Sequence, residues 1–259
     1  MMTLREFAAD NKVLVAAHRG SSGTAPENTM AALREAVEAG AHIVEVDIQL
    51  SSDEQVIVFH DEVLERTTNS EGKVGTRSYT ELRRVDAGAW FDARFRGEHI
   101  PLLSEALDFL GGKVNVNIEI KPPRAGEDFT RRVGLVAQMI SERGLQNNTL
   151  YSSFHHESLL RLKQEFEGMN TAAIHLPGDE RLPSEVVRAA NADAYVCGLR
   201  EVHPAAADDI REHGIFCGAY TINTPDQLRK AMGLPIKAIV TNFPARIAEL
   251  LTREYPDRI

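Results

Sequence analysis

Carboxylate side chains alternate with apolar ones in two stretches of the sequence. In residues 43–50, Glu45 and Asp47 fall on one face of an expected β-strand, because successive strand side chains point to opposite sides. In residues 114–121, Glu119 shares a face with other polar side chains, namely Asn115, Asn117 and Lys121. Three carboxylates that meet at one point offer hard oxygen ligands, which suit Mg2+ or Ca2+ better than Zn2+. The sequence therefore predicts a divalent metal site at Glu45, Asp47 and Glu119, with the choice between the two ions left open.

Two histidines stand where short apolar stretches end. His18 follows residues 13–17, and His60 follows residues 55–59. The pKa of an imidazole lies near neutral pH, so it can give or take a proton during catalysis. We interpret both as candidate catalytic residues because of their positions and the carboxylates around them. Five other histidines are interpreted as ordinary loop or helix residues: His155, His156, His175, His203 and His213.

The elements that must position these residues are strands and helices in alternation. Eight strands are expected, at residues 13–17, 43–50, 114–120, 149–154, 171–176, 194–199, 215–222 and 238–241. Signals for helix starts are Asn28 or Thr29, Ser104, the capping box from Thr224 to Gln227, and Pro244. Eight strand–helix repeats predict a parallel sheet closed into a (β/α)8 TIM barrel, with an open doubly wound sheet as the alternative.

One segment interrupts the alternation. After the second barrel strand we expect a short extra strand at residues 55–59, followed by an insertion at about residues 62–100. This connection is too long for an ordinary strand–helix loop, and loops at the mouth of a barrel usually build the substrate site. The simplest account is a single domain, residues 1–259, with the insertion over the barrel mouth.

Composition and charge exclude several classes of partner. The formal net charge of −9 argues against nucleic acid, because no basic excess is available to neutralise phosphates. No apolar run approaches the ~20 residues that cross a bilayer, and the charged residues 1–12 do not resemble a signal peptide. Cys197 and Cys217 are expected to be buried thiols in a reducing compartment, which favours a cytoplasmic protein without stable membrane insertion. The oligomeric state is not predicted.

Taken together, the motifs resemble the glycerophosphodiester phosphodiesterase family, over residues 13–244. The resemblance rests on His18-Arg19-Gly20, Pro26-Glu27-Asn28-Thr29, Glu45-x-Asp47, His60-Asp61, Glu119-x-Lys121, Tyr220-Thr221-Ile222-Asn223 and Thr241-Asn242-Phe243-Pro244. It departs from the family pattern at Tyr220, where Trp is usual, and at Asn242, where Asp is common. We expect these two departures to affect substrate fit more than activity.

The resemblance implies a function and a role for each candidate residue. It implies metal-dependent hydrolysis of glycerophosphodiesters, such as glycerophosphocholine and glycerophosphoethanolamine, to sn-glycerol 3-phosphate and an alcohol. It further implies that Glu45, Asp47 and Glu119 hold the metal, that Arg19 and Lys121 contact the substrate phosphate, and that His18 and His60 are general acid and base. Which histidine is the acid stays open, as does direct water attack against a cyclic intermediate.

Three other functions are consistent with a barrel of this kind. A Schiff-base aldolase would use Lys121 as nucleophile, but the nearby Glu119 should keep this lysine protonated. A non-catalytic binding barrel would be expected to have lost a metal ligand or a histidine, and all are present here. A phosphodiesterase of lysophospholipids or other lipid diesters would use the same residues with an acyl chain held by the insertion.

Overall fold

The computed structural model describes residue 6 and residues 12–123 and 128–259, and these form a closed barrel. Its eight parallel strands are β1 (Leu14–Ala17), β2 (Ile43–Leu50), β4 (Asn115–Ile120), β5 (Thr149–Ser153), β6 (Asn170–Ile174), β7 (Ala194–Gly198), β8 (Phe216–Tyr220) and β9 (Ala238–Thr241). Each pairs with the next, and β1 pairs with both β2 and β9, which closes the barrel. The predicted TIM barrel is confirmed, and the open doubly wound alternative is wrong. The segment expected not to be a signal peptide lies mostly outside the described residues.

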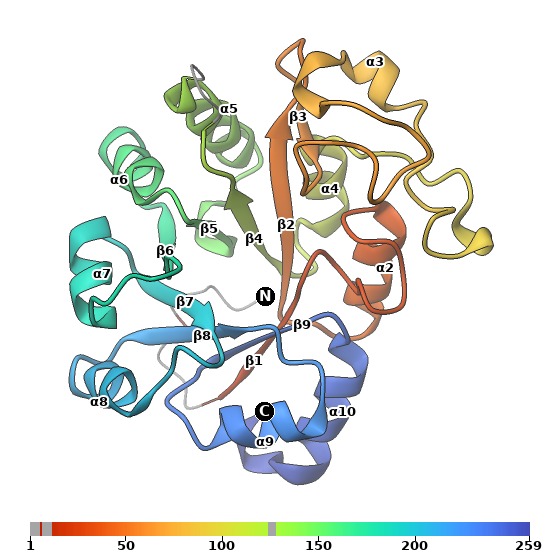
Figure 1. Ribbon diagram of the computed structural model, residues 1–259. Helices are drawn as coiled ribbons and strands as arrows, with labels where there is room; N and C mark the ends of the chain where they lie inside the picture. The colour runs from red at the N-terminus through yellow and green to blue at the C-terminus, as the bar shows by residue number, and fades with distance from the viewer. Residues whose placement is uncertain (1–5, 7–11, 124–127) are drawn as a thin grey trace.

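Helices surround the barrel (Figure 1). They are α2 (Met30–Glu38), α4 (Leu103–Leu110), α5 (Phe129–Glu142), α6 (His156–Glu165), α7 (Pro183–Ala190), α8 (Pro204–Glu212), α9 (Pro225–Met232) and α10 (Pro244–Glu254). The capping box at Thr224 and the start of α10 at Pro244 are as predicted. Thr29, rather than Asn28, caps α2. The helix expected to start at Ser104 begins at Leu103, because the Glu105 carboxylate accepts a hydrogen bond from the backbone N–H of Leu102.

The two faces of each strand have different surroundings. Apolar side chains of β2 and β4, such as Val46 and Ile118, belong to the main core between the sheet and the helices. Glu45 and Asp47 lie on the opposite face of β2, inside the barrel, and both are buried. A smaller apolar cluster, which includes Leu14 and Ile43, fills the barrel interior near the start of the strands. The charged side chains Glu45, Asp47 and Glu119 follow further along β2 and β4, towards the end of the barrel where the strands finish.

The insertion lies on one side of the barrel, beside α2 and α4 (Figure 1). It begins after β3 (Val56–Val58), which pairs antiparallel with β2, and includes the short helix α3 (Tyr79–Leu82). It has a small core of its own, formed by Ile57, Phe59, Leu64, Val74, Leu82, Ala87 and Ile100. This core anchors the insertion to β3 and so to the strand that carries Glu45 and Asp47. Among the residues that the structure describes, no helix is long and apolar enough to cross a membrane.

Candidate active site

A cavity of about 290 Å3 opens where the barrel strands end. Its lining includes six of the seven residues that the sequence singled out, namely His18, Arg19, Glu45, His60, Glu119 and Lys121. The seventh, Asp47, lies beneath them and contacts both Arg19 and Lys121. In a barrel of this kind, the carboxyl ends of the strands are where catalytic residues gather. The structure thus brings all the predicted site residues together.

The three predicted metal ligands form one acidic cluster. Strand register places Asp47 directly beside Glu119, and one oxygen of each carboxylate in Glu45, Asp47 and Glu119 lies within 4.8 Å of the others. Burial, together with the charges of Asp47 and Glu119, raises the pKa of Glu45. In the part of the chain that the structure describes, the buried Oε1 of Glu45 has no hydrogen-bond partner. A buried carboxylate oxygen without a partner is costly, and a divalent cation would satisfy it, so this cluster fits a metal ion with hard oxygen ligands.

Two cations flank the acidic cluster. Lys121 Nζ lies 2.5 Å from an oxygen of Asp47 and also contacts Glu119. Burial alone would lower the pKa of Lys121, but the two carboxylates more than offset this, so its pKa is raised. The amine therefore stays protonated, which argues against the Schiff-base alternative.

Arg19 owes its place to an unusual local backbone. Its φ is +57°, so its backbone N–H donates to Glu45 Oε2 at 2.7 Å while its guanidinium turns toward Asp47 and Glu27. Gly20 follows with φ +76°, and a Cβ there would lie 2.6 Å from the backbone of Ala32. Only glycine fits such a position, which explains the His-Arg-Gly sequence.

Residues of the loop before α2 form hydrogen bonds with the acidic cluster and with Arg19. The Asn28 side chain donates to Asp47 Oδ2 at 2.8 Å and accepts from the Asp47 backbone N–H at 3.2 Å. Glu27 accepts from Arg19 at 2.8 Å. The sequence motif that contains these two residues was noted, but no contact was predicted for either. Their position just before a helix start was the available signal.

His18 is held by a residue 224 positions away in the chain. Its Nδ1 lies 2.8 Å from Asn242 Oδ1, and since an amide oxygen only accepts, Nδ1 is the donor. Burial and the neighbouring Arg19 charge lower the pKa of His18 to about 4. Asn242 therefore bears on the proton chemistry of His18, whereas the sequence associated it with substrate fit. Tyr220, the other departure from the family pattern, lines the cavity itself.

His60 has a charged partner instead. Its Nδ1 lies 2.6 Å from Asp61 Oδ1, so an ionised Asp61 fixes Nδ1 as the donor. The amide of Gln49, at the end of β2, donates to the His60 carbonyl at 3.0 Å. In each histidine Nε2 is therefore the nitrogen that can exchange a proton with a ligand. The Nδ1 of His18 contacts an amide, whereas the Nδ1 of His60 contacts a carboxylate.

The remaining wall of the cavity is largely apolar. It is formed by Phe154, Ile174, Val196, Tyr220 and Val240. Two buried polar atoms, Asn117 Oδ1 and Ser152 Oγ, belong to cavity-lining residues and have no hydrogen-bond partner within residues 12–123 and 128–259. Ser152 was not predicted as a site residue, because a single serine in a strand forms no recognisable spacing pattern with other residues. A small ligand that carries hydroxyl groups on an apolar carbon skeleton would match such a wall.

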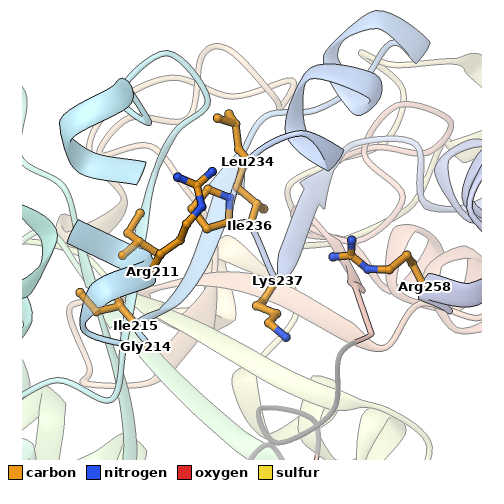
Figure 2. Close-up of a pocket in the computed structure, with 9 residues that line it drawn as sticks. Arg211, Gly214, Ile215, Leu234, Ile236, Lys237 and Arg258 are labelled. Atoms are coloured by element: carbon orange, nitrogen blue, oxygen red, sulfur yellow. The ribbon is translucent and has the colours of Figure 1, made fainter. Parts of the chain in front are cut away.

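Figure 2 shows the residues that line a second cavity, of about 380 Å3. It lies at the opposite end of the barrel, where the strands begin. Its residues come just before β8 and β9, for example Ile215 and Lys237, and from the chain end at Arg258. None of the predicted site residues lines it. That end of a barrel usually serves stability, so the chemistry belongs to the first cavity.

Comparison with known proteins identifies the family. Residues 18–246 match the model of the glycerophosphoryl diester phosphodiesterase family. A glycerophosphodiester phosphodiesterase from Caldanaerobacter subterraneus subsp. tengcongensis is 31% identical over 248 residues, covering 93% of this chain and 99% of the relative. One from Bacillus altitudinis is 32% identical, covering 90% and 96%.

Solved structures agree. A glycerophosphodiester phosphodiesterase from Agrobacterium tumefaciens is 30% identical with a TM-score of 0.80, covering 92% of this chain and 99% of that one. An Oleispira antarctica phosphodiesterase in complex with the product sn-glycerol-3-phosphate is 27% identical with a TM-score of 0.87, covering 94% and 98%. The chain belongs to the glycerophosphoryl diester phosphodiesterase family. The predicted enzyme class, a phosphoric diester hydrolase, is confirmed.

Proposed function

We propose that this enzyme hydrolyses glycerophosphodiesters, such as glycerophosphocholine and glycerophosphoethanolamine, to sn-glycerol 3-phosphate and an alcohol. The observation that carries the proposal is the gathering of three carboxylates, two cations and two histidines around one cavity of about 290 Å3. The sn-glycerol-3-phosphate bound in the Oleispira antarctica relative supports the same product. The polar and apolar walls suit a glycerol unit.

Glu45, Asp47 and Glu119 are proposed to hold a divalent cation, Mg2+ or Ca2+. Such a cation acts as a Lewis acid toward phosphoryl oxygens and makes a bound hydroxyl or water more acidic. The carboxylates themselves supply the oxygen ligands, two of them buried, at Glu45 and Asp47, and the third partly exposed, at Glu119. Asp47 is kept ionised for this role, because Lys121 and Arg19 lower its pKa by more than burial raises it.

Arg19 and Lys121 are proposed to bind the substrate phosphate. The guanidinium offers a planar fork of donors matched to two phosphate oxygens, and the ammonium group offers a point charge. Both are held by Asp47 before substrate arrives. Cations fixed in this way stabilise the negative charge that develops on phosphorus oxygens in the transition state, without reorganising first.

The two histidines are proposed to divide the proton transfers according to their partners. His18 is buried against a neutral amide and beside Arg19, which favours the neutral imidazole, so it accepts the proton of the attacking hydroxyl. His60 makes the opposite transfer: the contact of its Nδ1 with the Asp61 carboxylate orients the ring and leaves Nε2 to donate a proton to the leaving alcohol oxygen. An alkoxide is a poor leaving group, and this protonation is what allows it to depart.

Two further proposals concern the whole chain. A single domain spanning residues 1–259, with the insertion at about 62–100, is supported by the pairing of β1 with β9 and by the attachment of the insertion to β3. A cytoplasmic location is supported by Cys197 and Cys217, which are both buried and free.

The test is release of sn-glycerol 3-phosphate from glycerophosphocholine by purified protein, after EDTA treatment and then with Mg2+ or Ca2+ restored. Product that forms only with metal would support both the reaction and the acidic cluster as its site. Lysophosphatidylcholine is the matched comparison. Turnover of this lipid alone would replace the proposed substrate by a lipid diester, and product formation after complete metal removal would contradict the metal site.

A further inference from the structure

Arg66, in the insertion, joins the surroundings of both predicted catalytic motifs. Its Nε lies 2.5 Å from Asp61 Oδ2, and Asp61 Oδ1 is the partner of His60. Its two terminal nitrogens lie 2.7 and 2.8 Å from the two oxygens of Glu27, and Glu27 Oε1 is the partner of Arg19. An unbroken chain of side-chain hydrogen bonds therefore runs from His60 through Asp61, Arg66 and Glu27 to Arg19.

Both carboxylates of this chain depend on Arg66 for part of their surroundings. The side chains of Glu27 and Asp61 are 13% and 20% exposed, whereas that of Arg66 is 45% exposed. Burial alone would raise the pKa of Glu27, but Arg66 and Arg19 together lower it. Without Arg66, Glu27 would have one cation instead of two, and Asp61 would have only His60.

The backbone around Arg66 is fixed by the fold of the insertion. Thr67 and Thr68 are buried, and Thr68 Oγ1 donates to the Leu64 carbonyl at 2.7 Å. Leu64 belongs to the small core of the insertion. Arg66 is therefore presented from a packed turn, which limits the positions that its side chain can take.

We propose that Arg66 is a positioning residue that aligns the His60 imidazole and the Arg19 guanidinium for the same reaction; this inference rests on the proposed function. Arg66 does not line the cavity and acts only through Asp61 and Glu27. The role needs a guanidinium, because three donors of one rigid fork engage two carboxylates at once. A lysine has one nitrogen and would leave one carboxylate free to turn.

The test compares Arg66→Gln and Arg66→Lys with Arg77→Gln. Arg77 is a matched control because it also lies in the insertion and bonds Ser70 and the Glu71 carbonyl, away from the cavity. Small displacements of catalytic groups cost up to about 100-fold in rate. We expect Arg66→Gln to lower kcat/KM for glycerophosphocholine by about 10- to 100-fold, with kcat reduced and KM raised. Arg66→Lys should recover less than half of the loss on a logarithmic scale, and Arg77→Gln should stay within about twofold of wild type.

The contacts of Arg66 with Asp61 and with Glu27 should have different effects on kcat and KM. Asp61→Asn is expected to lower mainly kcat, through His60, and Glu27→Gln to raise mainly KM, through Arg19. Combining Arg66→Gln with Asp61→Asn should cost less than the product of the two single effects, because both remove the same contact. Full additivity, or an Arg66→Gln enzyme with wild-type kcat and KM, would overturn the inference. So would a loss that merely follows a lowered melting temperature and is matched by Arg77→Gln.

A readout that does not need turnover separates this inference from the proposed function. In protein labelled with 15N-histidine, the imidazole signals of His60 should move in Arg66→Gln and in Asp61→Asn, but not in Arg77→Gln. If wild-type protein releases no glycerol 3-phosphate from any diester, the proposed function fails, and these signals still decide whether Arg66 orients His60. Unchanged His60 signals in Arg66→Gln would refute the positioning role.

Discussion

Replacing Asn242 with Asp would place a charge 2.8 Å from the His18 ring without changing the shape of the side chain. The wild-type amide is neutral, and burial together with Arg19 holds the pKa of His18 at about 4. A negative charge at contact distance typically raises the pKa of an imidazole by about 1 to 3. A pKa change of 1 corresponds to about 1.4 kcal/mol of added preference for the protonated form. The variant should therefore hold the proton on His18 to a higher pH than wild type does.

The sign of the effect on activity follows from the role proposed for His18. The neutral imidazole is the working form, so kcat/KM is lost as the pH falls through the pKa of His18. In wild type this loss should begin only near pH 4 to 5. A rise of about 2, in the middle of the range given above, would leave about half of the enzyme with neutral His18 at pH 6, and a rise of about 3 would leave about a tenth. Activity at pH 6 should then fall about two- to tenfold below the plateau of the same variant.

The assay is kcat/KM for glycerophosphocholine from pH 4.5 to 9, at a metal concentration that saturates both enzymes. Saturation matters because protonation of Glu45 or Glu119 also removes activity, and that limb of the profile moves with metal concentration whereas the His18 limb does not. Asn242→Ala is the control, because it removes the hydrogen-bond acceptor without adding a charge. In this variant kcat/KM should still fall only at low pH, as in wild type. An unmoved acid limb in Asn242→Asp would refute the reasoning, as would a wild-type limb already near pH 6.5.

The other predictions concern the metal, the histidines and the phosphate. Glu119→Ala should weaken Mg2+ binding at least about tenfold in calorimetry, because one of three carboxylate ligands is gone; unchanged affinity would place the metal elsewhere. Burial and the charges of Asp47 and Glu119 raise the pKa of Glu45, so the metal-free protein loses stability as the pH rises through that pKa. The gain in melting temperature on adding Mg2+ should therefore be larger at pH 8 than at pH 5. His18→Ala and His60→Ala should each lower kcat by about 100- to 10,000-fold while circular dichroism and metal binding stay as in wild type; full activity of either variant would show that its imidazole transfers no proton. Arg19→Lys should raise KM, because one ammonium group replaces a fork that contacts both Glu27 and Asp47, and kinetics indistinguishable from wild type would exclude phosphate binding by the fork.

The residues on each strand face could be predicted from the sequence because they depend on local geometry. Alternation with period two placed Glu45 and Asp47 on the inner face of β2 and Val46 on the outer face, and the structure has them there. The same rule brought Glu119 to the cavity. Eight strand–helix repeats favoured a closed barrel over an open doubly wound sheet, and the pairing of β1 with both β2 and β9 decided between the two. Within the predicted strands and helices, the differences lie at element ends, such as the start of α4, where capping contacts outweigh propensity.

The tertiary structure decided which partner holds His18 and how the segments around His60 are connected. Asp61 follows His60 in the chain and could be suspected, but Asn242 reaches His18 only because β9 pairs with β1 when the barrel closes. Arg66 meets Glu27 across 39 positions because the insertion has its own core and folds back toward the loop before α2. Side-chain period carries information over a few residues, whereas these contacts depend on how distant segments pack. The sequence by itself therefore determined the chemistry of the site and the fold that displays it, and the closed barrel decided how each catalytic group is oriented and charged.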